Sequence, residues 1–145
     1  MAETINVLLV EDSHADARLI TEVFHDEKIM VTIEIVRDGV EAMEYLRSEK
    51  TKPDLIILDL NLPRKDGREV LAEIKEDSRL KTIPVVILTT SQSEEDILKS
   101  YKLNANCYVT KPIDLDQFIK IIKSIDEFWF SAVKFPRFSQ PELEK

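Results

Sequence analysis

Three short runs that are mostly apolar limit most strongly the fold that this chain can adopt. They are INVLLV at 5–10, LIILDL at 55–60 and PVVILTT at 84–90. A strand with one face in solvent alternates apolar and polar residues, whereas an unbroken run suits a strand that is covered on both faces. These runs therefore predict a parallel sheet with helices on both sides.

Two further strands complete the predicted sheet. The segment VTIEIV at 31–36 alternates, which suits an edge strand, and CYVT at 107–110 is a short fifth run. We expect Cys107 to be a small buried apolar residue.

Apolar residues at helical spacing lie between the strands. They predict helices that begin after Ser13, Asp38 and Gly67, a fourth helix at 93–104 and a final helix that Asp114 caps. The inward stripe of the final helix is expected to contain Leu115, Phe118, Ile122, Ile125 and Trp129. Five strand-then-helix units predict a doubly wound α/β fold, with a five-stranded parallel sheet flanked by five helices and right-handed crossovers.

Length, charge and cysteine content narrow the class of protein. A chain of 145 residues with 43% hydrophobic residues suits one domain. The net charge of -8 repels phosphate backbones and anionic membranes, so we expect neither nucleic acid nor a membrane as a direct partner. A single cysteine, no basic leader and no apolar stretch near membrane-spanning length predict a cytoplasmic protein.

Polar residues gather at the predicted carboxyl ends of the strands. The parallel topology brings these ends to one edge of the sheet, where ligands of α/β proteins bind. The residues that follow or end the strands there are Glu11, Asp12, Asp59, Thr89 and Lys111. Crowded carboxylates repel one another unless cations offset their charge, so the sequence predicts a cation site.

The residue types at this edge fit phosphoryl transfer. Mg²⁺ or Mn²⁺ takes carboxylate and carbonyl oxygens, which predicts ligands from Glu11, Asp12, Asp59 and the backbone carbonyl of Asn61. A carboxylate is also a nucleophile toward phosphorus, and Asp59 ends the central apolar run. The ammonium of Lys111 and a hydroxyl at position 89 suit the charge that develops on the phosphoryl oxygens.

The chain resembles a two-component response-regulator receiver domain. The matching residues are the acidic pair Glu11 and Asp12, Asp59 in LDLNLPRKDG, Thr89 in ILTT, Tyr108 in CYVTKP, and Lys111 with Pro112. The resemblance spans roughly residues 4–127. The segments DLNLPRKDGREVLAEIK and FWFSAVKFP are similar to the stand-alone receivers of bacterial phytochrome histidine kinases.

This resemblance implies a flavodoxin-like strand order of 2-1-3-4-5 and a function. Asp59 would accept a phosphoryl group from a sensor histidine kinase, and Thr89 and Tyr108 would switch the surface that an unknown downstream protein recognises. The Lys111–Pro112 bond would be cis. Two positions depart from the usual pattern: Glu11 replaces a common aspartate, and Thr90 replaces a small residue and narrows access to the acyl phosphate.

Three other classes of protein remain as alternatives. A metal-dependent phosphohydrolase with an aspartyl nucleophile needs a second aspartate two residues after the first, where this chain has Asn61. A flavin-binding electron carrier needs a phosphate loop rich in serine, threonine and glycine after the first strand, but the sequence there is EDSHADA. A pseudo-receiver typically lacks the acceptor, an acid or the lysine, and all are present here.

The C-terminal part has more apolar residues than one helix face can bury. We expect a receiver domain at 1–130, an extension at 131–145 and no separate output domain. Exposed apolar patches mark interaction sites, and a two-fold contact is their most frequent use, so we expect a homodimer through the final helix and extension. The alternative is that the extension folds back over its own core. The residues beyond the inward stripe are Ile121, Phe128, Phe130, Val133, Phe135 and Phe138.

Overall fold

The computed structural model describes residues 4–27, 29–48, 52–90 and 107–125. The chain forms two compact units, residues 1–112 and residues 113–145. The helix predicted at 93–104 and the extension at 131–145 lie outside the described residues. No helix in the described ranges has the length and apolar character needed to cross a membrane.

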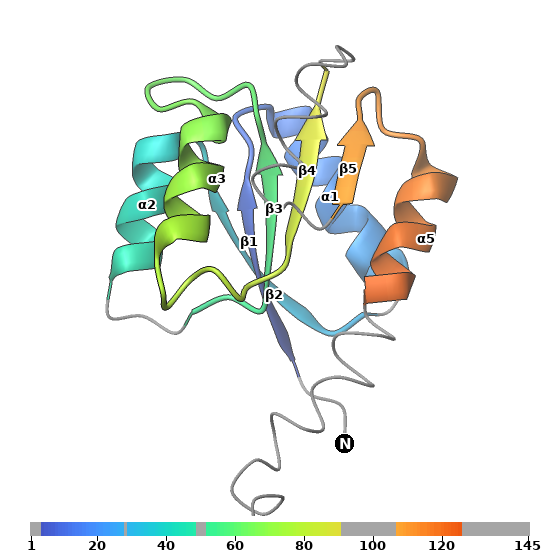
Figure 1. Cartoon of the computed structure of the whole chain (residues 1–145). Coiled ribbons are helices and arrows are strands. Elements are labelled where there is room, and N and C mark those ends of the chain that lie inside the picture. Colours follow the sequence, from blue (N-terminus) through green and yellow to red (C-terminus); the bar gives the residue numbers. More distant parts are fainter. Residues whose placement is uncertain (1–3, 28, 49–51, 91–106, 126–145) are drawn as a thin grey trace, which may run out of the picture. The chain divides into compact units, whose positions relative to one another are not determined.

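The first unit is built around a five-stranded sheet (Figure 1). Its strands are β1 (Ile5–Val10), β2 (Val31–Val36), β3 (Leu55–Asp59), β4 (Val85–Thr89) and β5 (Cys107–Thr110). All neighbouring strands are parallel, in the order β2-β1-β3-β4-β5. The doubly wound α/β class and the strand order implied by the resemblance are confirmed.

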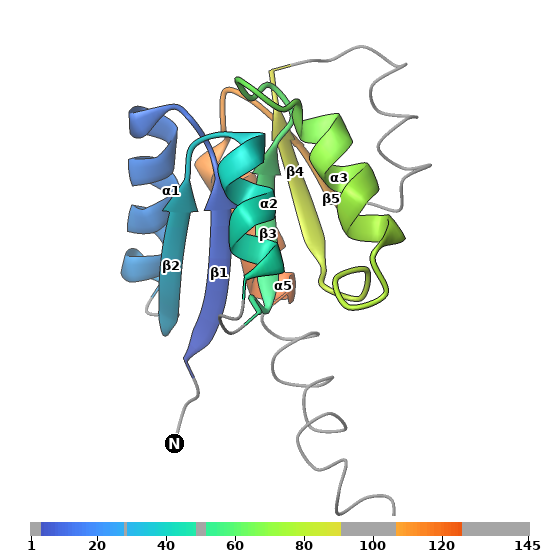
Figure 2. The same ribbon diagram turned by 90° about the vertical axis from the view of Figure 1, so that its left-hand side faces the viewer.

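Three helices of the first unit cover both faces of its sheet. Figure 2 shows α2 (Gly39–Arg47) and α3 (Gly67–Glu76) together on one side, and α1 (His14–Asp26) lies on the other. The side chains of α2 and α3 form one core cluster with Leu8 and Val10 of β1. The odd-numbered residues of β1 point to the opposite face, because successive side chains alternate along a strand.

The burial of the strands follows their position in the sheet. All five residues of β3 are buried, as expected for a central strand with helices on both faces. The alternating strand β2 lies at one edge, as predicted. Cys107 is half-buried rather than buried, because it begins β5 at the opposite edge of the sheet.

Short polar side chains begin the helices of the first unit. The Ser13 side chain accepts a hydrogen bond from the backbone N–H of Asp16, and the Asp38 side chain accepts one from Glu41. Asp66 and Glu69 form a reciprocal capping box at the start of α3. These bonds satisfy N–H groups that have no partner within the first helical turn, which fixes where each helix begins.

The second unit contains α5 (Leu115–Ile125) within its described residues. Asp114 caps this helix through a hydrogen bond from the Gln117 N–H, as predicted. Phe118 and Ile122 are buried, but Leu115 is 43% exposed, which corrects its predicted place on the inward stripe. Leu115 is the first helical residue, and a helical side chain points back toward the N-terminus, beyond the stripe. The side chain of Ile125 and all of Trp129 lie outside the description.

Gly67 brings α3 against the end of β3. A Cβ atom at this position would lie 2.3 Å from the carbonyl oxygen of Asp59 and 2.5 Å from Cα of Leu60. The Gly67 N–H also donates to the Leu60 carbonyl over 3.0 Å. The absence of a side chain at Gly67 therefore sets how closely the helix can approach the backbone of Asp59.

We expect Gly67→Ala to lower the free energy of unfolding by about 1–3 kcal/mol, because the added methyl would collide with backbone atoms, which cannot rotate away. Urea denaturation measures the change. Glu76→Ala is the control, because Glu76 is exposed on the same helix. Equal stability of Gly67→Ala and Glu76→Ala would contradict this packing argument.

Candidate functional site

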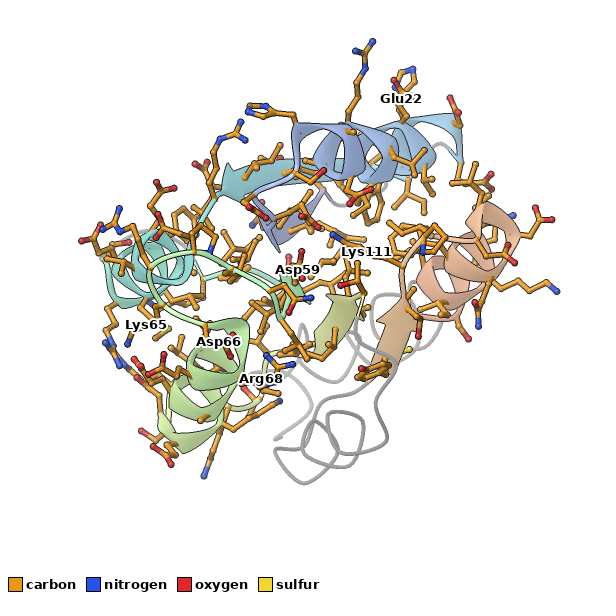
Figure 3. All side chains as sticks on the ribbon, turned by 90° about the horizontal axis from the view of Figure 1, so that it is seen from above. Glu22, Asp59, Lys65, Asp66, Arg68 and Lys111 are labelled. Atoms are coloured by element: carbon orange, nitrogen blue, oxygen red, sulfur yellow. The ribbon has the colours of Figure 1, made fainter. Side chains whose placement is uncertain are left out.

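The candidate site lies at the carboxyl edge of the sheet in the first unit. Glu11 and Asp12 follow β1, Asp59 is the last residue of β3, and Lys111 follows β5. The Glu11 N–H donates to the Val36 carbonyl over 2.9 Å, which holds the backbone after β1 against β2. Viewed along the strands from this edge, Asp59 and Lys111 lie side by side near the centre (Figure 3).

Three carboxylates meet at this edge. Glu11, Asp12 and Asp59 each offer one oxygen, and these three atoms lie within 4.8 Å of one another. Glu11 and Asp59 are buried, whereas Asp12 is exposed. The three predicted acids are therefore brought together, with one side open to solvent.

Lys111 neutralises part of this negative charge. Its Nζ lies 2.7 Å from Oε1 of Glu11, 2.9 Å from Oδ2 of Asp59 and 2.9 Å from Oδ2 of Asp16. The lysine side chain is only 8% exposed. The peptide bond between Lys111 and Pro112 is cis, as the resemblance implies.

Burial and nearby charges both shift the pKa values of Glu11 and Lys111. Desolvation by burial raises the pKa of Glu11 to about 7; the hydrogen bond from Lys111 opposes this rise and the nearby charge of Asp59 adds to it. Burial acts to lower the pKa of Lys111, but hydrogen bonds to Glu11, Asp59 and Asp16 outweigh it and raise that pKa. Lys111 is therefore a fixed positive charge at neutral pH.

The second oxygen of Asp59 is held by the loop that follows β3. Oδ1 accepts a hydrogen bond from the Asn61 N–H over 2.8 Å. The Asn61 side chain donates to the Thr90 hydroxyl over 3.1 Å, which links the ends of β3 and β4. Asn61 thus lies beside the acids, and the role of its backbone carbonyl as a metal ligand stays a prediction.

Charged residues also hold the loop between β3 and α3. Arg64, whose φ is 66°, forms an ion pair with Asp38, the cap of α2. Lys65 forms an ion pair with Glu73 of α3. Figure 3 shows Lys65, Asp66 and Arg68 around this loop and the start of α3, away from Lys111. The loop that carries Asn61 is therefore tied to both α2 and α3.

The two predicted switch residues lie on β4 and β5. Thr89 ends β4 and pairs with Thr110 of β5, but its side chain lies outside the description. Tyr108 is half-buried and packs against the core cluster shared by α2 and α3. Their roles as a switch stay predictions.

Asp16 is the one Lys111 partner that the sequence analysis missed. It lies in the first turn of α1, three residues after the cap Ser13. An acid in a first helical turn has a common structural reason, because the helix dipole favours it there. The sequence feature that could have identified Asp16 as a site residue is its position one helical turn after Asp12, on a helix that begins at the site.

Comparisons with known proteins identify the same type of domain. The family model described as response regulator receiver domain matches residues 7–123. Response regulator Rcp1 of Synechocystis is 50% identical over 135 residues, which cover 90% of this chain and 92% of the relative.

Two solved structures are similar to this chain in both sequence and fold. The phosphorylated cyanobacterial phytochrome response regulator RcpA has a TM-score of 0.78 and 53% identity, over 90% of this chain and 96% of RcpA. The Mn²⁺-bound form of Rcp1 has a TM-score of 0.77 and 49% identity, over 88% of this chain and 96% of Rcp1. With a family model that covers most of its length and a fold to match, this chain belongs to the response regulator receiver domain family.

Proposed function

We propose that Asp59 is the phosphoacceptor of a single-domain response regulator and that a sensor histidine kinase is its donor. The observation that carries this proposal is the 2.9 Å contact between the buried Asp59 carboxylate and Lys111. An Asp59 oxygen attacks phosphorus, a P–O bond forms, and the P–N bond of the phosphohistidine breaks. The electron pair of that bond stays on the imidazole. Lys111 stabilises the charge on the phosphoryl oxygens.

The residues around Asp59 suit a divalent cation. Glu11, Asp12, Asp59 and the Asn61 carbonyl would hold Mg²⁺ or Mn²⁺, because hard cations prefer oxygen ligands and the three carboxylate oxygens lie within 4.8 Å. When bound, the ion supplies positive charge beside the transferring group. The Mn²⁺-bound form of the related Rcp1 supports this proposal.

The phosphorylated state would be read through Thr89 and Tyr108. A phosphoryl oxygen on Asp59 would attract the Thr89 hydroxyl, and Tyr108 would move from its half-buried position into the space released. A modification shifts such an equilibrium only by stabilising one state more than the other. The pairing of β3 with β4 and of β4 with β5 supports the proposal, because it connects the three strands that carry these residues.

The chain would act as a signalling protein whose only chemistry is its own phosphorylation and dephosphorylation. The phosphohydrolase alternative lacks support, because position 61 is asparagine and the matching family is the receiver domain. The relatives named as phytochrome response regulators favour a phytochrome-type kinase. The cytoplasmic location, the unknown downstream partner and the lack of nucleic-acid binding stay predictions.

Asp59→Asn should abolish phosphorylation. With acetyl phosphate and Mg²⁺, the wild-type intact mass should rise by one phosphoryl group, and the variant should show no rise because its amide is a poor nucleophile. Asp26→Asn is the control, because Asp26 is exposed at the end of α1. A phosphoryl group on Asp59→Asn would move the acceptor to another residue.

We propose that residues 1–130 form the receiver domain and that residues 131–145 form a C-terminal extension. We also propose that two copies of the chain form a homodimer through the final helix and this extension. Sedimentation at micromolar concentration should give a dimer for the full chain and a monomer after deletion of 131–145, because the deletion removes apolar surface from the contact. Glu76→Gln, an exposed change in α3 outside the proposed contact, should leave the dimer intact. A monomeric full chain in both the free and phosphorylated states would leave only the fold-back alternative.

A further inference from the structure

Lys111 has a partner outside the acidic cluster. Oδ2 of Asp16 lies 2.9 Å from its Nζ, whereas the three acids grouped as a possible cation site are Glu11, Asp12 and Asp59. We propose that Asp16 is a positioning residue, which holds the Lys111 ammonium in place while Asp59 is phosphorylated. This inference rests on the proposed function and extends it to a residue that was not predicted.

The number of donors on Lys111 makes its partners compete. An ammonium group has three N–H donors. In the unphosphorylated site, the three short contacts to Glu11, Asp16 and Asp59 match all three donors. Lys111 must therefore release one carboxylate before it can donate to a phosphoryl oxygen.

Asp16 is the partner that keeps its contact. One Asp59 oxygen bonds to phosphorus in the reaction, and Glu11 belongs to the acids that suit a cation. Phosphorylation therefore changes the surroundings of Asp59, and a bound cation changes those of Glu11. Asp16 lies on α1, outside this group of three acids, so it neither bonds to phosphorus nor belongs to the proposed cation site. It can retain one N–H of Lys111 while another turns from Asp59 to the phosphoryl oxygen.

The location of Asp16 suits this role. Its backbone N–H donates to the Ser13 hydroxyl over 3.2 Å, which fixes the first turn of α1. The positive end of the helix dipole favours an ionised carboxylate there. Its side chain is 31% exposed, compared with 8% for Lys111, so Asp16 stays partly in contact with solvent while it holds the lysine. The first turn of α1 therefore presents a charged acceptor to the ammonium.

The first test compares rates of phosphorylation by acetyl phosphate with Mg²⁺. In this reaction an Asp59 oxygen bonds to phosphorus, the bond from phosphorus to the acetyl oxygen breaks, and acetate leaves with the electron pair. We expect Asp16→Asn to be about tenfold slower, the effect of one hydrogen bond to a charged group. Asp16→Glu should recover most of the rate because it restores the charge. Glu22→Gln, an exposed change on the same helix labelled in Figure 3, should match the wild type.

A double variant tests whether Asp16 acts through Lys111. In a Lys111→Met background, Asp16→Asn should cause no further loss of rate, because the group that it positions is absent. A general structural defect would instead slow both backgrounds by the same factor. That result, or an Asp16→Asn rate equal to the wild type, would overturn the inference.

A second measurement does not depend on phosphorylation. In the metal-free protein, the Lys111 ammonium should give a resolved, slowly exchanging signal in a ¹H–¹⁵N spectrum of the lysine side chains. We expect the wild type and Glu22→Gln to show this signal and Asp16→Asn to lose it. An unchanged signal in Asp16→Asn would overturn the inference even if the wild type is phosphorylated. Loss of the signal in a protein whose wild type accepts no phosphoryl group would support the positioning contact and contradict the proposed function alone.

Discussion

The charge of Lys111 among three carboxylates is the interaction on which the site depends. Glu11 and Asp59 are buried, and a buried carboxylate without a partner is costly. The ammonium lies within 2.9 Å of both, as well as of Asp16. Without this charge, the acids would repel one another and take up protons. The lysine thus offsets the repulsion between acids that the fold brings together at the end of a hydrophobic sheet.

The fold brings these groups together from distant parts of the chain. Lys111 is 100 residues from Glu11 and 52 from Asp59, yet both contacts are direct. Parallel strands make this possible because their carboxyl ends share one edge. Gly67 allows α3 to pack against the backbone of Asp59, and the loop between them is tied to its neighbours by ion pairs. The packing therefore fixes the acid that we propose as the phosphoacceptor.

The sequence predicted the parts of this structure that follow from periodicity and from strand ends. Apolar runs such as 55–58 indicated buried parallel strands, and polar residues at the strand ends indicated where Asp12, Asp59 and Lys111 would meet. Asp16 was missed because an acid in a first helical turn has a sufficient local explanation in the helix dipole. Its contact with Lys111 depends on where α1 lies relative to β5, which no local pattern encodes.

Two packing predictions failed for a related reason. Residue type predicted that Cys107 is buried and helical periodicity predicted the same for Leu115, but each begins its element and is only partly covered. Apolar character indicates that burial is favourable and does not specify how much of a terminal residue its neighbours cover. By contrast, all five residues of β3 are buried, as expected for a central strand that helices cover on both faces.

A calorimetric titration with Mg²⁺ tests most directly the claim that Lys111 and a divalent ion balance the same carboxylates. Lys111→Met should bind Mg²⁺ more tightly than the wild type, because the competing ammonium is gone, and Asp12→Asn should bind it more weakly. Equal affinity in the wild type and both variants would show that the ammonium and the ion do not share these carboxylates.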